Sequence, residues 1–208
     1  TYSGGYVDIL EAAARVDHPE RAPEFINLGL PSETVSGLSE PGHAGGQFPR
    51  PTVHERLDRV FAKTKPDLIV ACYGMNCGMY YPFSEERFAK YREGIELLRK
   101  KAAAAGAKVI HFTPPVFDPV PIKARLLPAG LAEYKQPFEG YNTVLDRYSE
   151  WLLQQRAQGW LVFDTHFPMA KFLADARATD PAFKLAGDGV HINATGHWLI
   201  AREVLRAF

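Results

Sequence analysis

Short apolar runs alternate along the chain with longer segments in which apolar residues recur every three or four positions. A continuous apolar run suits a strand buried in a parallel sheet, and the three-to-four spacing is typical of an amphipathic helix. The clearest run is Asp67–Tyr73, whose Leu-Ile-Val-Ala-Cys segment we expect to be buried on both faces of a sheet. The pattern predicts four strands in all: Phe25–Leu28, Asp67–Tyr73, Lys108–Phe112 and Trp160–Asp164.

Helices are predicted between these strands. The clearest one follows Ser84, a residue type that caps helix N-termini, with Glu85 and Glu86 in its first turn and Gly106 as its stop. Apolar spacing predicts further helices at Tyr6–Val16, Thr52–Lys63, Pro137–Arg156 and from Asn193 to Leu205.

Alternation of strands and helices is the pattern of the α/β class. We therefore expect a three-layer α/β/α sandwich, in which helices cover both faces of a central parallel sheet with flavodoxin-like strand order. The chain has 208 residues, which is enough for a domain with a sizeable core, and we expect residues 1–208 to form a single domain.

Two long connections interrupt this alternation. The segment Gly37–Pro51 is rich in glycine and proline, and Thr113–Pro137 is rich in proline. Each is expected to leave the carboxyl end of a strand, which is where open α/β sheets bind their ligands. Loops of this length are often functional, although plain surface excursions give the same pattern.

Composition narrows the range of partners. The 24 Lys and Arg residues balance the 24 Asp and Glu residues, so nothing favours nucleic acid or an acidic membrane surface, which attract a basic excess. No apolar stretch approaches the roughly 18 residues of a membrane-spanning helix. The two cysteines, Cys72 and Cys77, are too few for a disulfide framework or a metal cluster, and we expect two free thiols.

The strongest candidate for chemistry is the segment from Asp188 to His191. An aspartate three residues before a histidine, in a tight turn, can bring the two side chains together. The carboxylate then fixes the imidazole tautomer and stabilises the imidazolium, which is the orienting half of a nucleophilic triad. The spacing alone is common, so a purely structural turn is the alternative.

Two further candidates follow predicted strands. Asn76, in Gly-Met-Asn after the Asp67–Tyr73 run, is placed to donate its amide to a developing oxyanion, or is a turn-forming residue. Gly29, in Asn-Leu-Gly after another run, lets the backbone approach a ligand and offer its N–H, or is an ordinary loop glycine.

Taken in this order, the three segments resemble the conserved blocks of the SGNH hydrolase superfamily of GDSL-type esterases and lipases. Asn27-x-Gly29 is similar to the second block, Gly74-x-Asn76 to the third, and Asp188-Gly-Val-His191 to the fifth. The resemblance implies a Ser-His-Asp triad that contains His191 and Asp188, with oxyanion donors from Gly29 and Asn76. It also implies no cofactor and no metal.

The first block of that superfamily, Gly-Asp-Ser on the first strand, does not occur in the 208 residues. The resemblance matches Thr1 to the residue two places after the nucleophile, so the serine is expected two positions upstream of Thr1. It also implies that a first strand, which the 208 residues lack, lies between the strands Phe25–Leu28 and Asp67–Tyr73. The alternative nucleophile within the sequence is Ser3.

The resemblance further implies hydrolysis of a carboxylic ester. Polar, proline-rich loops without a broad apolar lid favour short O-acetyl groups on carbohydrate over the longer chains of a lipase or thioesterase. Tyr80 and Tyr81 follow Asn76 and either line an acyl or sugar site or belong to the core. The expected partner is therefore a small-molecule or glycan ester. If the upstream residue is not serine, a non-catalytic module that binds a glycan or another partner is the alternative.

Overall fold

Three parallel strands form the centre of the molecule. The computed structural model describes residues 4–21 and 23–206, and within them the sheet has the order β1-β2-β3. Strand β1 is Leu68–Cys72, β2 is Lys108–Phe112 and β3 is Leu161–Phe163. Leu68 lies opposite Lys108, and Ile110 lies opposite Leu161. Three of the four predicted strands are therefore confirmed, in the parallel arrangement that the sequence predicts.

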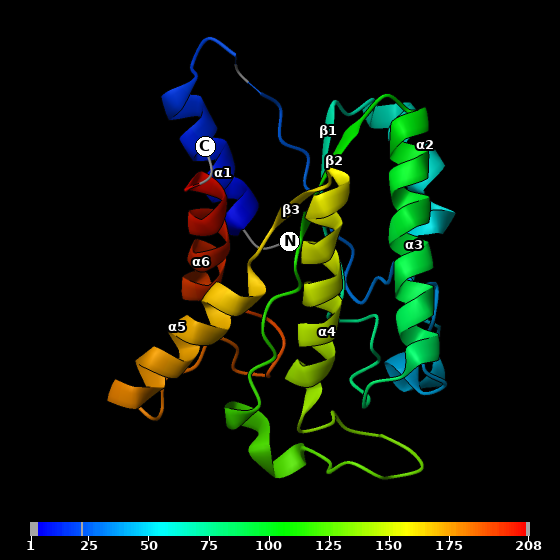
Figure 1. The fold of residues 1–208 in the computed structure, drawn as a ribbon, viewed down its shortest axis with the longest axis vertical. Helices are drawn as coiled ribbons and strands as arrows, with labels where there is room; N and C mark the ends of the chain where they lie inside the picture. Colours follow the sequence, from blue (N-terminus) through cyan, green and yellow to red (C-terminus); the bar gives the residue numbers. More distant parts are fainter. Residues whose placement is uncertain (1–3, 22, 207–208) are drawn as a thin grey trace.

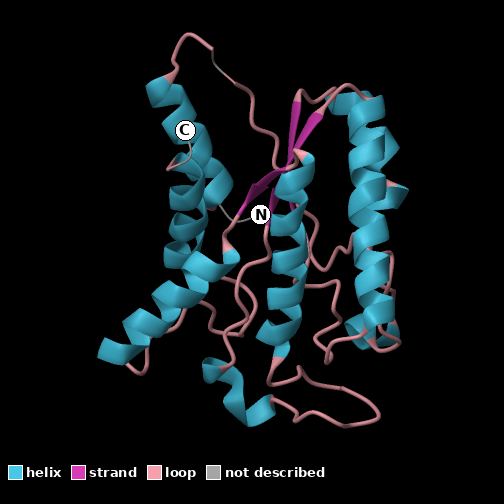
Figure 2. Ribbon diagram, in the orientation of Figure 1, coloured by secondary structure: helices cyan, strands magenta, loops and turns pink. Residues whose placement is uncertain are grey.

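Helices lie on both sides of this sheet (Figures 1 and 2). The described α-helices are α1 (Tyr6–Asp17), α2 (Leu57–Thr64), α3 (Glu85–Ala104), α4 (Tyr141–Gln154), α5 (His166–Thr179) and α6 (Ala194–Leu205). Four short 3-10 helices, η1 (His43–Gly46), η2 (Val53–Glu55), η3 (Val120–Arg125) and η4 (Gln155–Gln158), lie in the connections. The α/β class with helices on both faces is confirmed.

Alternate residues of β2 supply two separate cores. Val109 packs with α2, α3 and α4 on one face, and Tyr91 and Tyr148 stack there with ring centroids 4.4 Å apart. Ile110 and Phe112 pack with α1, α5 and α6 on the other face. This period of two is what a strand covered on both faces requires. Both cysteines are free, as the sequence predicts.

The predicted strand Phe25–Leu28 is wrong. The segment has no strand structure and makes no ladder with β1, which pairs only with β2 within the described residues. An extended run becomes a strand only where a neighbouring backbone accepts its hydrogen bonds. The expectation that β1 is buried on both faces is also wrong. Within the described residues β1 is an edge strand, and its side chains Leu68 and Val70 are 50% and 43% exposed.

Helix α5 has no counterpart in the sequence prediction. It begins after Asp164, whose Oδ1 accepts hydrogen bonds from the backbone N–H groups of His166 at 3.1 Å and Phe167 at 3.2 Å. Met169 and Leu173 are buried along its inner face. Those two residues, four apart and following a capping aspartate, are the signal that could have predicted it.

Two predicted helices begin later in the structure than in the sequence prediction. The residues before α2 form the 3-10 helix η2, so α2 starts at Leu57 and not at Thr52. Helix α4 starts at Tyr141 and not at Pro137, because the N–H of Phe138 donates to the carbonyl of Tyr80 at 2.8 Å in a loop.

His111 in β2 makes stability depend on pH. Its side chain is fully buried against Trp160, at 5.5 Å between ring centroids, and neither ring nitrogen has a hydrogen-bond partner. Burial, with a smaller contribution from the Arg99 guanidinium, lowers the pKa of His111 to about 3. The unfolded chain, with an ordinary histidine pKa near 6.5, therefore binds a proton that the folded chain does not.

We predict that His111→Phe becomes stabilising relative to the wild type as the pH falls from about 6.5 towards 3. The wild type loses about 1.4 kcal/mol of folding free energy per pH unit in that window. At pH 4.5 the variant should gain roughly 2–3 kcal/mol relative to its effect at pH 7.5. Urea denaturation at the two pH values measures this, and a pH-independent difference would contradict the prediction.

Candidate active site

The turn from Asp188 to His191 brings its two polar side chains into contact. Asp188 Oδ2 accepts a hydrogen bond from His191 Nδ1 at 2.6 Å. Asp188 Oδ1 accepts from the backbone N–H groups of Val190 at 2.9 Å and His191 at 2.8 Å. Gly189 adopts a φ of +88°, which glycine tolerates and which closes the turn. The sequence expectation that this spacing brings the pair together is confirmed.

The ionised Asp188 carboxylate determines which ring nitrogen of a neutral His191 carries the proton. Partial burial on its own would raise the pKa of Asp188, but the hydrogen bonds from the His191 ring and from two backbone N–H groups lower it to about 2. The ionised carboxylate can only accept, so Nδ1 of His191 carries the proton and Nε2 presents a lone pair in the neutral ring. His191 is 76% exposed, and its Nε2 makes no hydrogen bond to any described residue. The free nitrogen is therefore available as a base.

A buried ion pair holds this turn in place. The Asp118 side chain is fully buried and pairs with Arg177, while its second oxygen accepts from the N–H of Leu185 at 3.0 Å. The Asp118 backbone N–H donates to the carbonyl of Gly189 at 2.8 Å. Asp118 lies in the Thr113–Pro137 connection, so that loop has a function in fixing the site. No local sequence pattern distinguishes Asp118 or Arg177.

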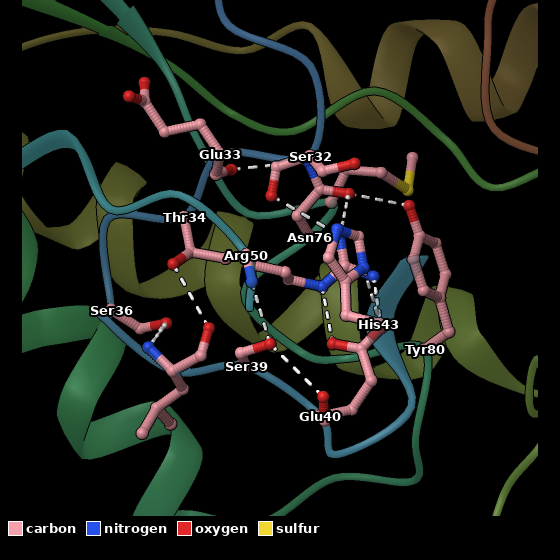
Figure 3. Close-up of polar contacts among 12 residues, drawn as sticks. Ser32, Glu33, Thr34, Ser36, Ser39, Glu40, His43, Arg50, Asn76 and Tyr80 are labelled. Atoms are coloured by element: carbon pink, nitrogen blue, oxygen red, sulfur yellow. Dashed lines mark hydrogen bonds and ion pairs between the residues drawn. The ribbon is translucent and has the colours of Figure 1, made fainter. Parts of the chain in front are cut away.

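Asn76 follows β1 and is held by three hydrogen bonds (Figure 3). Its Oδ1 accepts from Arg50 Nη1 at 3.2 Å and from Tyr80 Oη at 2.8 Å. Its Nδ2 donates to the carbonyl of Glu33 at 3.3 Å. Among the described residues, the second Nδ2 hydrogen has no partner. The amide can therefore donate to a ligand without losing a contact.

Arg50 comes from the other long connection, Gly37–Pro51. Its guanidinium makes a paired contact with the carboxylate of Glu40, with both N–O distances 2.6 Å. Burial opposes ionisation of Glu40, but the hydrogen bonds and charge of Arg50 outweigh it, and the pKa of Glu40 is lowered. Neither residue was identified from the sequence, although the length and composition of their loop marked the segment as a candidate.

Among the described residues, no hydrogen bond joins the predicted oxyanion donor Gly29 to Asn76 or to the Asp188–His191 turn. Gly29 is exposed, and its N–H donates to Asn27 Oδ1 at 3.2 Å. Two later residues of this segment reach Asn76 and its partner: the Glu33 carbonyl accepts from Asn76 Nδ2 at 3.3 Å, and the Ser32 carbonyl accepts from Arg50 Nη1 at 3.4 Å. Ser32 has a φ of +63°, and its own N–H donates to no described residue. Gly29 stays a prediction, and Ser32 is a second candidate for the backbone donor.

Tyr80 links the two halves of the site. Burial raises its pKa, Arg50 opposes that change, and the negative charges of Glu40 and Asp188 add to it. Asn76 follows the carboxyl end of β1. Asp118, whose backbone N–H donates to the Gly189 carbonyl, follows the carboxyl end of the parallel strand β2, so the Asp188–His191 turn and Asn76 lie at the same end of the sheet. The alternative nucleophile Ser3 lies outside the described residues.

A pocket of about 700 Å³ opens beside Tyr80, between the two long connections. Tyr81 lies in its wall and packs against Tyr134, with ring centroids 5.7 Å apart. The other lining residues come from the same two loops and from the turn after Asn76: Glu40, Pro41, Gly42, Met79, Tyr80, Ala132, Glu133, Lys135, Gln136 and Pro137. Tyr80 and Tyr81 both line this pocket, and Tyr80 also packs against the core, so a role for the two residues in substrate binding stays a prediction.

His197, the histidine nearest this turn in sequence, packs on helix α1. Its Nδ1 accepts from the N–H of Tyr6 at 3.4 Å, and the two rings stack at 6.1 Å.

Within residues 4–21 and 23–206, no three His, Cys, Asp or Glu side chains gather in a way that could hold a metal ion. In the same part of the chain, no helix combines the length and apolar character needed to cross a bilayer.

Comparison with solved structures supports the fold. An acetylxylan esterase from Geobacillus stearothermophilus is 20% identical, with a TM-score of 0.66, over 97% of this chain and 80% of that one. An α/β hydrolase enzyme from the metagenome of Lake Arreo, Spain, is 21% identical, with a TM-score of 0.67, over 98% and 81%. A gut microbial diltiazem-metabolizing enzyme is 19% identical, with a TM-score of 0.73, over 98% and 43%.

Comparison with protein families identifies the family as well as the fold. No curated protein sequence matches this chain significantly. The GDSL-like Lipase/Acylhydrolase family matches residues 2–199, which is nearly the whole chain and includes each segment that resembles a block of that family. The chain therefore belongs to the GDSL-like lipase/acylhydrolase family, the SGNH hydrolases, whose members are serine hydrolases.

Proposed function

We propose that this protein is a serine esterase that removes short acyl groups, above all acetyl, from carbohydrate alcohols. The observation that carries the proposal is the Asp188–His191 pair, with its free Nε2, at the same end of the sheet as Asn76. A base and a fixed amide donor at one end of the sheet are two of the components that acyl transfer requires, since one takes a proton while the other stabilises negative charge.

In the proposed mechanism, His191 Nε2 takes the proton of the serine hydroxyl as its oxygen attacks the ester carbonyl. Asp188 stabilises the imidazolium that forms, and Nδ2 of Asn76 donates to the carbonyl oxygen as it becomes negative. The backbone N–H of Gly29 or of Ser32 is the second donor. His191 then gives the proton to the leaving alkoxide, and the acyl group stays bound to the serine oxygen. Water attacks this acyl-enzyme as His191 takes its proton, and His191 returns the proton to the serine oxygen as the acid leaves.

The nucleophile is proposed to be a serine on a strand that pairs with the free edge of β1. Strand β1 is bonded on one side only within the described residues, and Leu68 and Val70 on it are exposed. Apolar strand residues with an unpaired backbone edge favour a further strand beside them. Ser3 is the alternative, and retention of activity in Ser3→Ala would exclude it.

One observation supports the proposed triad, and a second supports an acetylated carbohydrate as substrate. In the acetylxylan esterase from Geobacillus stearothermophilus, a serine, an aspartate and a histidine are replaced in structures described as catalytic mutants. Its aspartate and histidine are three positions apart, as are Asp188 and His191. In addition, the pocket combines tyrosine rings with carboxylate, amide and ammonium groups, which suits a neutral alcohol that carries several hydroxyls.

The acyl preference is a direct test. We predict that p-nitrophenyl acetate is cleaved with a kcat/KM at least about tenfold above that of p-nitrophenyl octanoate, because one or two kcal/mol of misfit for a long chain gives that ratio. The His191→Ala variant measures the background rate for each ester. A preference for octanoate would overturn deacetylation and leave a lipase-type or thioesterase-type acyl hydrolase, while no cleavage of either ester would contradict the esterase itself.

A further inference from the structure

Two hydrogen-bond donors meet on the carboxamide oxygen of Asn76. Arg50 Nη1 lies 3.2 Å and Tyr80 Oη lies 2.8 Å from this oxygen, so both of its lone pairs are used. A guanidinium has no acceptor atom, and therefore the oxygen and nitrogen of the amide cannot exchange places. Nδ2 is forced to face the carbonyl of Glu33 at 3.3 Å, with one N–H left over.

Arg50 is itself held rigidly. Its side chain is only 6% exposed, and the Glu40 carboxylate binds two of its nitrogens at 2.6 Å. Its backbone N–H donates to Ser39 Oγ at 2.9 Å, and its guanidinium lies 5.6 Å from the centre of the Tyr80 ring. A continuous line of hydrogen bonds thus runs from the Glu40 carboxylate through the Arg50 guanidinium to the amide (Figure 3).

We infer that Arg50, assisted by Tyr80, is a positioning residue that locks the Asn76 amide in its donor orientation and strengthens its free N–H. The inference rests on the proposed function, in which Asn76 stabilises the oxyanion. A cation on the carboxamide oxygen draws electron density from the nitrogen, and hydrogen bonds in a chain polarise one another. A donor that is already oriented needs no reorganisation when charge develops on the substrate.

A double-mutant cycle in the full-length protein tests this inference. Arg50→Met keeps the length of the stem and removes the donor, and Tyr80→Phe removes one hydroxyl. Each is made alone and together with Asn76→Ala, and kcat and KM for p-nitrophenyl acetate are measured per folded molecule. Alone, Arg50→Met should lower kcat about tenfold and Tyr80→Phe about threefold, the effects of losing a charged and a neutral hydrogen bond, with KM within about twofold. In the Asn76→Ala background each change should alter kcat by less than about twofold, because the amide that it positions is gone.

Arg99→Gln is the matched control. Arg99 lies over the Trp160 ring at 4.0 Å, and Trp160 precedes β3, so this arginine is at the opposite end of the parallel strands from Asn76. It should leave kcat within about twofold of the wild type, as expected for a surface change far from the site.

The outcomes separate the inference from the proposed function. Equal losses in the two backgrounds, or unchanged kcat in the single variants, overturn the positioning role of Arg50 and Tyr80. If Arg50→Met does not fold, Tyr80→Phe decides alone by the same comparison. Wild-type kcat in Asn76→Ala overturns the donor role of Asn76 in the proposed function and the inference with it.

Discussion

Replacing His191 with alanine is expected to lower kcat for p-nitrophenyl acetate by roughly 10⁴–10⁶, the range for loss of a triad base. Its Nε2 is the one imidazole nitrogen of the Asp188 turn that is free to take the serine proton. Without it the serine hydroxyl stays protonated, and only the oxyanion donors and substrate binding remain. Steady-state rates in the full-length protein measure the loss, and KM should change far less than kcat.

His197→Ala is the matched control for that experiment. The same residue type is lost six positions later, but this ring stacks on Tyr6 on helix α1. We expect kcat to stay within about threefold of the wild type and stability to fall by roughly 1–3 kcal/mol, as for loss of a partly buried contact. If both histidine variants lose activity equally, His191 has no special chemical role and the proposed mechanism is wrong.

Asp188→Asn extends the same test to the carboxylate. The carboxylate is ionised at neutral pH, because its pKa is lowered to about 2 by the hydrogen bonds that outweigh its partial burial. An amide in its place cannot stabilise an imidazolium and can donate to Nδ1, which puts the proton on the wrong nitrogen. A loss in kcat of about 10⁴ is expected on this ground.

Local sequence patterns predict most of the fold and the contact between Asp188 and His191. Three strands follow from apolar runs, and Asp188 and His191 follow from a three-residue spacing that closes within one turn. Each of these depends on residues close together in the chain. The wrong strand, Phe25–Leu28, had the same local pattern but lacked a partner strand, which no local pattern can supply.

The supporting residues of the site lie beyond the reach of such patterns. Arg50 contacts Asn76 across 26 positions, and Arg177 contacts Asp118 across 59 positions. Both arginines are paired with a carboxylate away from water, and neither an arginine in a polar loop, as Arg50 is, nor one in the last turn of a helix, as Arg177 is, has a sequence pattern that predicts burial. The sequence could mark the loops Gly37–Pro51 and Thr113–Pro137 as candidates by length. Which side chain in each loop turns inward is decided by tertiary packing.

Asn76→Ala is expected to lower kcat by roughly 10²–10³ while KM changes little, since an oxyanion donor acts mainly on the transition state. The structure adds a second effect. Alanine leaves the Arg50 and Tyr80 donors without their acceptor, at a cost of roughly 1–3 kcal/mol in folding free energy for each buried group left unpaired. Rates must therefore be expressed per folded molecule, with the folded fraction taken from urea denaturation of the same sample.

Asn76→Asp separates the catalytic effect from the structural one. Aspartate has the shape of asparagine and keeps an oxygen for Arg50 and Tyr80, so the contacts that Asn76 Oδ1 makes are retained. Its other oxygen, however, takes the place of Nδ2 and faces the Glu33 carbonyl with a negative charge instead of a donor. A negative charge at that point repels the oxyanion. We therefore expect Asn76→Asp to bind Arg50 at least as well as the wild type and to lose at least as much kcat as Asn76→Ala, about 10²-fold or more. If Asn76→Asp instead keeps wild-type kcat in a folded protein, Asn76 does not donate to the substrate.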